Sequence, residues 1–256
     1  MWKVEPIGLP PSLRAGFTTS QAPAGFQGER FTFEPKAHTE SRDSVLSRRV
    51  VTSFCGVDDD SWRDVHQVHG ANVIECTEES LGRVEADALW TRHSGLVLAI
   101  RTADCVPIIV ASWTDHIIAV IHAGWRGTHK NIVGHTLDAI VAATGAELGS
   151  FSAVIGPCIH AHAFEVDADV AVPFQDAFEH SVVERTPGKD SRWNVDLVQA
   201  NSRQLEACGL SPERIKALPM CTVHDSRFWS HRRQRAQAGR QVAFACMEPR
   251  SETPIS

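Results

Sequence analysis

LVLAI at residues 96–100, VPIIVA at 106–111 and IIAVI at 117–121 are three continuous apolar runs in close succession. Each run is too short for a typical helix, and none shows the apolar–polar alternation of a strand with one exposed face. Continuous runs of this kind are typical of strands buried on both faces. We therefore predict three strands that are covered on both sides.

Helical periodicity appears on both sides of these runs. The segment 41–55 places apolar residues at helical spacing before Gly56, and the segment at about 129–144 does so before Gly145. The other expected elements are a strand at 152–155, a helix at 196–208 with an Asp cap, and a helix start at Ser211-Pro212-Glu213. Strands mixed with helices predict an α/β or α+β architecture without fixing its topology.

Composition limits the class of protein. The 256 residues are 43% hydrophobic and 22% charged, with a formal net charge of −6, which is typical of a globular chain and disfavours nonspecific nucleic-acid binding. The seven cysteines include no C-x-x-C pair, so a disulfide framework is not expected. The N-terminal residues do not form a signal peptide, and no apolar run is long enough to span a membrane. We therefore expect a cytoplasmic protein with no nucleic-acid or membrane partner.

Three segments place a possible metal ligand at the end of a predicted strand. They are HQVHGANV (66–73), RTADCVPIIV (101–110) and IHAGWRGT (121–128), which contain His69, Cys105 and His122. Imidazole and thiolate are favoured zinc ligands, and a set of three leaves one position open for water or substrate, as in catalytic zinc sites. A single histidine or cysteine more often has only a packing role, so residue type alone leaves both interpretations open.

Two further segments are candidates for anion binding. Gly124 and Gly127 allow a ligand close to the backbone, a helix start there would attract anions, and Arg126 is a suitable phosphate donor. Near the C-terminus, CTVHDSRFWSHRR (221–233) offers Arg232 and Arg233. The alternatives are an ordinary strand-to-helix turn and a solvated run of charges.

Several motifs in one order resemble a known family. QVHGANV, DALWT, TADCVPIIV, HAGWRGT, IGPCI followed by FEV, and CT…FWSHRR…GR, between about residues 65 and 245, are similar to the polyphenol-oxidase (laccase-domain) family. The resemblance implies a single-domain layered α/β sandwich with mixed β-sheets over residues 1–256, related to cysteine-hydrolase-like toxins. It also implies that the zinc ligands of that family fall on His69, Cys105 and His122.

The resemblance implies an activity as well. Family members are described as zinc-dependent purine nucleoside enzymes that phosphorolyse adenosine, inosine, guanosine and methylthioadenosine and deaminate adenosine. The expected partners are a purine nucleoside and phosphate, with Arg126, Arg232 and Arg233 available to orient the phosphate. Asp104 is a candidate for proton transfer or for orienting a ligating histidine. The oligomeric state stays open.

The chain departs from the family pattern in two regions. TTSQAPAGFQGERFTFEPK (18–36) lacks the usual glycine-rich stretch, which leaves substrate preference open. The chain has no tyrosine, and Phe164 and His231 stand where relatives often have one. A tyrosine hydroxyl therefore has no role here.

Three other functions compete with the zinc enzyme. A copper-dependent polyphenol oxidase (laccase) needs several H-x-H pairs for a multinuclear cluster, and His160-Ala-His162 is the single such pair in the chain. A metal-free cysteine hydrolase would use Cys105 as nucleophile and His122 as base. Because family members are also described as peptidoglycan editing factors, the third alternative is a non-catalytic role in cell-wall maintenance.

Overall fold

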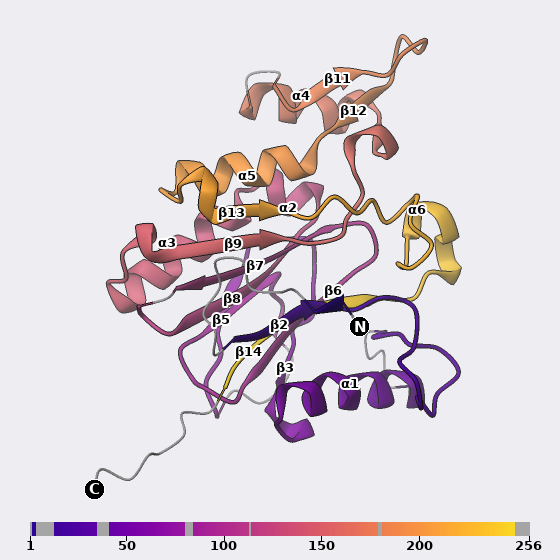
Figure 1. The fold of residues 1–256 in the computed structure, drawn as a ribbon. Helices are drawn as coiled ribbons and strands as arrows, with labels where there is room; N and C mark the ends of the chain where they lie inside the picture. The colour runs from indigo at the N-terminus through magenta and orange to yellow at the C-terminus, as the bar shows by residue number, and fades with distance from the viewer. Residues whose placement is uncertain are drawn as a thin grey trace, which may run out of the picture.

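The computed structural model describes residues 2–3, 13–34, 41–79, 84–112, 114–178 and 181–248. Its centre consists of two stacked β-sheets with helices on the outer faces of both (Figure 1). The six-stranded sheet has the order β13-β9-β7-β8-β5-β4. In chain order its strands are β4 (Val73–Glu75), β5 (Ala88–Thr91), β7 (Val106–Ser112), β8 (Ile117–Ala123), β9 (Phe151–Ile155) and β13 (Ile215–Ala217).

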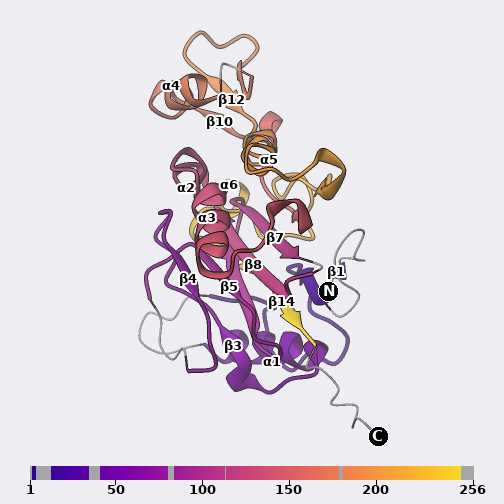
Figure 2. The ribbon, with the colours of Figure 1, turned by 90° about the vertical axis from the view of Figure 1, so that its left-hand side faces the viewer.

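The second large sheet has five strands in the order β1-β2-β14-β6-β3. These are β1 (Trp2–Lys3), β2 (Leu13–Phe17), β3 (Trp62–Arg63), β6 (Val97–Thr102) and β14 (Gln241–Met247). A small third sheet contains β10 (Glu165–Val166), β11 (Val183–Arg185) and β12 (Trp193–Val195). Together with α4 (Ala168–Ala177), it stands beyond α5 and away from the stacked sheets (Figure 2).

Helices cover the outer faces of the two large sheets. α1 (Arg42–Cys55) packs on the five-stranded sheet, and α3 (Ile132–Thr144) and α5 (Leu197–Ala207) lie on the six-stranded sheet. The short helix α2 (Trp125–His129) follows β8 in the chain, and the short helix α6 (His231–Gln234) comes shortly before β14. Both large sheets contain parallel and antiparallel pairs, so the expected layered α/β sandwich with mixed sheets is confirmed.

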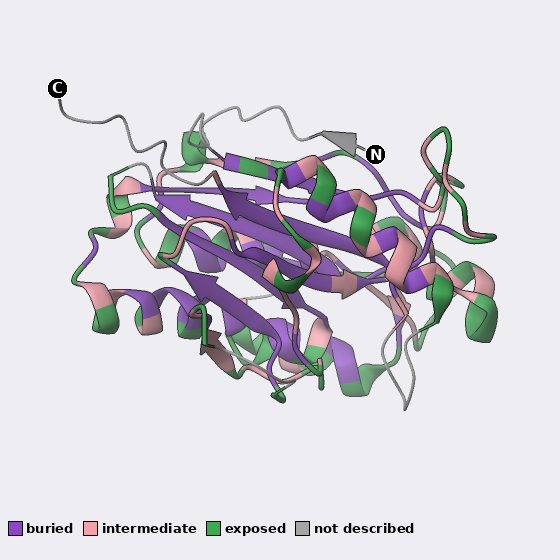
Figure 3. Cartoon of the chain, turned by 90° about the horizontal axis from the view of Figure 1, so that it is seen from below, coloured by how far each residue is buried: buried purple, intermediate pink, exposed green. Residues whose placement is uncertain are grey.

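The central strands show why their sequence is continuously apolar. Ile108 and Val110 of β7 belong to the core between the six-stranded sheet and α3, whereas Ile109 and Ala111 belong to the core between the two sheets. Successive side chains of a strand point to opposite faces, so a strand in an inner layer must be apolar at every position. Figure 3 shows the strands as buried elements inside a more exposed helical surface. The three predicted strands are confirmed.

The ends of two helices, α1 and α5, match the ends predicted from the sequence. The Ser41 hydroxyl accepts the Ser44 N–H at the start of α1, and Gly56 ends this helix at φ 73°. Asp196 caps α5 by accepting the Gln199 N–H. These caps satisfy backbone N–H groups that have no partner inside the helix, and the glycine adopts a left-handed conformation that other residues avoid.

Two helix predictions were wrong in their extent. The helix expected at about 129–144 is interrupted, because Asn131 is left-handed (φ 57°) and begins α3 by accepting the Gly134 N–H with its side chain. At 211–213 the chain forms only a 3-10 turn, Pro212–Arg214, and then enters β13. Among the described residues, the helices are too short or too polar to cross a membrane.

Candidate metal centre and active site

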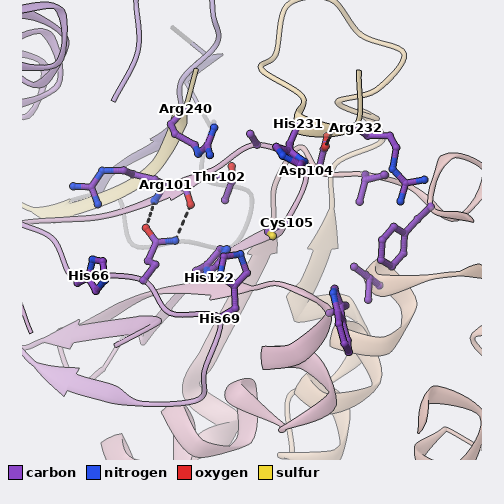
Figure 4. Close-up of a pocket in the computed structure, with 16 residues that line it drawn as sticks. His66, His69, Arg101, Thr102, Asp104, Cys105, His122, His231, Arg232 and Arg240 are labelled. Carbon is purple, nitrogen blue, oxygen red and sulfur yellow. Dashed lines mark hydrogen bonds between the residues drawn. The ribbon is translucent and has the colours of Figure 1, made fainter. Parts of the chain in front are cut away.

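The ends of adjacent strands bring His69, Cys105 and His122 together. His122 is near the end of β8, and Cys105 lies in the turn directly before β7. These strands are antiparallel and pair Pro107 with His122, so the start of one lies beside the end of the other. His69 arrives from the loop before β4, and the ligand atoms of all three side chains lie within 4.8 Å of one another (Figure 4).

A buried aspartate organises this cluster. The Asp87 carboxylate, directly before β5, accepts the backbone N–H groups of His69 (3.0 Å) and Gly70 (2.6 Å). It also lies 2.7 Å from Nδ1 of His122. One side chain therefore fixes both the loop that presents His69 and the ring orientation of His122. With its Nδ1 bonded to a carboxylate, His122 has Nε2 available as a ligand, which is the usual arrangement around metal-binding histidines.

The cluster shifts the protonation of its own members. Burial disfavours the Cys105 thiolate, but the His122 and His69 rings outweigh burial and lower the pKa of Cys105 to about 6. Burial likewise disfavours a charged His122, yet the Cys105 thiolate and the Asp87 carboxylate raise the pKa of His122 to about 9. A thiolate is the form of cysteine that ligates metals and attacks electrophiles, so this environment suits either role.

Two glycines permit the close packing of the cluster. A Cβ on Gly124 would lie 3.1 Å from the Cys105 sulfur and 3.2 Å from the His69 ring. A Cβ on Gly127 would lie 2.9 Å from the Gly70 carbonyl oxygen, closer than real Cβ contacts. The turn after β8 therefore needs glycine at Gly127 to lie against the loop that presents His69.

The cluster lies in the wall of a cavity of about 520 Å³. Its basic lining residues, besides the cluster itself, are His66, Arg101, His231, Arg232 and Arg240. Its apolar lining residues include Trp125, Ile159, Phe164 and Leu197. Several positive groups beside an apolar wall suit a ligand that combines an anionic or strongly polar part with a flat hydrophobic part.

The arginines predicted from the sequence occupy three different environments. Arg232 lines the cavity, and its guanidinium lies 5.6 Å from the Phe164 ring centre. The Arg233 guanidinium instead donates to the Thr222 carbonyl (2.7 Å) and to the carbonyls of neighbouring residues. Arg126 is exposed, stacks 4.2 Å above the Trp125 ring and is not among the residues that line the cavity. The structure thus brings only Arg232 of these three to the cavity wall beside the cluster.

Asp104 lines the cavity but does not contact a ligating histidine. Its carboxylate accepts the Thr222 hydroxyl (2.7 Å) and the Arg232 backbone N–H (2.6 Å), and its backbone is left-handed at φ 94°. It therefore joins the turn that carries Cys105 to the start of α6. The aspartate that orients His122 is Asp87.

Sequence reasoning missed Asp87 and the attachment of the His69 loop. Gln67 exchanges two 2.8 Å hydrogen bonds with the backbone of Arg101, shown as dashed lines at Arg101 in Figure 4. Asp87 is the aspartate of the DALWT motif and stands directly before an apolar strand. A charged residue at that position was the one sequence feature that could have pointed to it. Pairing between β5 and β8, which places Asp87 beside His122, is not visible in the sequence.

The donor set fits a metal ion. Two imidazoles and a thiolate converge, one imidazole is oriented by a buried carboxylate, and the cavity borders the cluster. Such a set matches zinc and also matches copper(I), and three protein ligands leave a position for an exchangeable group.

Comparisons with known proteins identify the family. The family model described as multi-copper polyphenol oxidoreductase laccase matches residues 30–248. A Xylella fastidiosa protein named purine nucleoside phosphorylase is 36% identical over 187 residues, covering 71% of this chain and 70% of its own length. A Deinococcus radiodurans protein of the same name is 32% identical over 242 residues, covering 94% of this chain and 89% of its own length.

Solved structures share the fold. The crystal structure of YlmD from Geobacillus stearothermophilus superposes with a TM-score of 0.85 at 27% identity, covering 93% of both chains. The Bacillus licheniformis hypothetical protein YfiH gives a TM-score of 0.84 at 24% identity, covering 92% of this chain and 93% of its own. On the extent of the sequence match, this chain belongs to the multi-copper polyphenol oxidoreductase laccase family.

Proposed function

We propose that this chain is a zinc-dependent purine nucleoside enzyme. Its reactions would be phosphorolysis of adenosine, inosine, guanosine and methylthioadenosine, and hydrolytic deamination of adenosine. The main support is the convergence of His69, Cys105 and His122 at the wall of a cavity of about 520 Å³. The names of the relatives from Xylella fastidiosa and Deinococcus radiodurans support the substrate class.

His69, Cys105 and His122 would hold the zinc ion, which supplies a Lewis acid at the cavity wall. Asp87 keeps the His122 ring in one orientation through the contact at Nδ1 and holds the His69 backbone in place. A site fixed by such contacts needs little rearrangement when substrate binds.

The cavity offers separate surfaces for the two halves of a nucleoside reaction. Trp125 and Phe164 provide flat apolar surface for a purine base, and Arg232 and Arg240 provide positive charge for phosphate. In phosphorolysis a phosphate oxygen bonds to C1′ while the bond from C1′ to the base breaks. In deamination water adds at C6 and ammonia leaves. Holding both reactants beside the cluster is the contribution of the lining residues.

The alternative functions differ in the metal that they need. Among the residues that the structure describes, possible metal ligands gather in two groups, each of three side chains. A multinuclear copper site needs more ligands than either group offers, which favours a single zinc over a laccase-type cluster. A metal-free cysteine hydrolase would use the same Cys105 and His122, and the lowered Cys105 pKa suits a nucleophile. Metal dependence therefore separates the cysteine hydrolase from the zinc enzyme.

The test combines metal analysis with an assay of adenosine and phosphate. We expect zinc in protein purified without added metal, and adenine and inosine as products. Cys105→Ala should lose both activities, whereas Cys208→Ala, which removes a cysteine that is not among the lining residues, should keep them. Full activity in His122→Ala at full zinc content would overturn the proposal. Activity that resists chelators but is lost on iodoacetamide treatment would point to the cysteine hydrolase.

A further inference from the structure

A second group of possible metal ligands lies outside the proposed zinc site. His162, Cys221 and His224 place their ligand atoms within 4.8 Å of one another. Nε2 of His162 is 3.0 Å from Nδ1 of His224, and the two rings stack with centres 4.9 Å apart. Both histidines are exposed and Cys221 is buried, so the group opens to solvent over a buried sulfur.

Cys221 and His224 lie on one tight turn. The His224 N–H donates to the Cys221 carbonyl (3.2 Å), which closes a Cys-x-x-His turn. Cys221 is joined to the inner structure by a β-bridge to Cys158. The Arg233 guanidinium donates to the Thr222 and Val223 carbonyls at 2.7 and 2.8 Å, and so holds the middle of the turn. The two ligands on this turn therefore have a fixed backbone.

The segment that presents His162 is held in place by its own hydrogen bonds, separate from those of the Cys221 turn. It is the 3-10 turn Ala161–Ala163, and its Ala161 carbonyl accepts the Asn194 amide at 2.7 Å. The Arg232 guanidinium donates to the Ala163 carbonyl (3.4 Å) and the Glu165 carbonyl (3.2 Å). The backbone that presents His162 is therefore held by Asn194 and Arg232.

The spacing of the two imidazoles suits a tetrahedral ion. Ligand nitrogens about 2.0–2.1 Å from a tetrahedral ion lie about 3.3 Å from each other. The observed 3.0 Å between His162 and His224 would have to open by a few tenths of an ångström. Two imidazoles and a thiolate select a thiophilic ion rather than magnesium or calcium, which prefer oxygen ligands.

We propose that His162, Cys221 and His224 form a second, solvent-accessible site for a thiophilic metal ion of the zinc type. It shares no ligand with the His69–Cys105–His122 site and is formed by different segments. It neighbours the cavity, because Arg232 contacts the segment of His162 and also lines the cavity. An ion there would fasten the Cys221 turn to the Ala161–Ala163 turn at the cavity rim.

The experiment uses the full chain in the Cys105→Ala background, which removes the thiolate of the first site. Metal-free protein is titrated with Co²⁺, and the charge-transfer absorption between thiolate and cobalt is recorded, followed by displacement with Zn²⁺. We expect one Co²⁺ per chain with a thiolate band that Zn²⁺ abolishes. Adding His162→Ala or His224→Ala should weaken binding at least tenfold, and both positions are exposed, so folding should persist.

His160→Ala is the matched control, because its ring centre lies 5.9 Å from that of His162 but it does not belong to the group. This variant should keep the band and the affinity. Absence of a thiolate band in Cys105→Ala would overturn the second site, as would an unchanged band in His162→Ala together with His224→Ala. The readout does not depend on nucleoside turnover, so failure of the proposed function leaves this test unaffected.

Discussion

Replacing Asp87 by Asn tests whether one buried carboxylate organises the first metal site. Asp87 is fully buried, and one of its oxygens faces the N–H of His69 and Nδ1 of His122. The other oxygen accepts the N–H groups of Val68 (3.2 Å) and Gly70 (2.6 Å). Asn is nearly the same size but keeps only one oxygen, so its NH₂ group must face two former donors in either orientation.

The magnitude follows from the donors left without an acceptor. If the NH₂ faces Val68 and Gly70, two buried N–H groups lose their partner at about 1–3 kcal/mol each, which gives a loss of about 2–6 kcal/mol in unfolding free energy. If it faces His122 instead, the ring must accept at Nδ1 and carry its proton on Nε2, the nitrogen needed for the metal. This second orientation should weaken zinc binding by about 10- to 100-fold, the usual cost of a lost partner of a ligating histidine. The first orientation keeps the oxygen toward His122 and instead weakens zinc binding through the loop that presents His69, because Val68 and Gly70 flank that residue.

Urea unfolding of the metal-free protein and competition with a zinc chelator measure the two effects. Asp59→Asn is the control, because its carboxylate accepts hydrogen bonds from Arg49 and Thr52 at the protein surface beside α1. It should cost about 1 kcal/mol and leave the zinc affinity unchanged. Asp87 would not organise the site if Asp87→Asn kept its zinc affinity within twofold of wild type and lost less than 1 kcal/mol of unfolding free energy.

Three other substitutions test separate contacts. Gly127→Ala should weaken zinc binding severalfold, because its Cβ would press on the Gly70 carbonyl. Gly149→Ala is the control, because a Cβ there meets nothing within 4 Å, and it should leave zinc binding unchanged. Competition with a zinc chelator compares the two variants. Arg232→Ala should raise the KM for phosphate about tenfold, or about 1.4 kcal/mol, and the exposed Arg126→Ala less than twofold, in steady-state kinetics. Asn201→Ala should lower the unfolding free energy by about 2 kcal/mol with zinc affinity unchanged, because its amide donates to Thr128 and Leu197; an equal loss in zinc affinity would contradict this.

The sequence predicted those elements whose signal is local. The run VPIIVA indicated a doubly buried strand because a short run that is apolar at every position is compatible with few structures, and β7 confirms it. The interruption of the helix after β8 was missed although it has a local cause: Asn131 is left-handed and caps α3 through its own side chain, two roles that asparagine favours. The order of strands in the sheets depends on contacts between distant segments and leaves no local signal.

In the candidate site too, features with a local sequence signal were predicted and features that depend on contacts between distant segments were not. His69, Cys105 and His122 were identified from residue type at strand ends, and the structure places them together. Asp87 was missed because its importance comes from the pairing of β5 with β8. Arg126 stands beside two glycines in the sequence, but its side chain stacks on Trp125. The extent of the domain over residues 1–256 and a cytoplasmic location stay predictions.

The three proposed ligands of the first site come from three separate segments that meet only when β7 and β8 are paired. An unfolded chain therefore offers no comparable site, so metal binding at the proposed site would be coupled to folding. Free metal at 100 times its dissociation constant would stabilise the folded chain by about 2.7 kcal/mol. The melting temperature of this protein should thus rise with metal concentration, so that thermal denaturation can serve as an indicator of free metal.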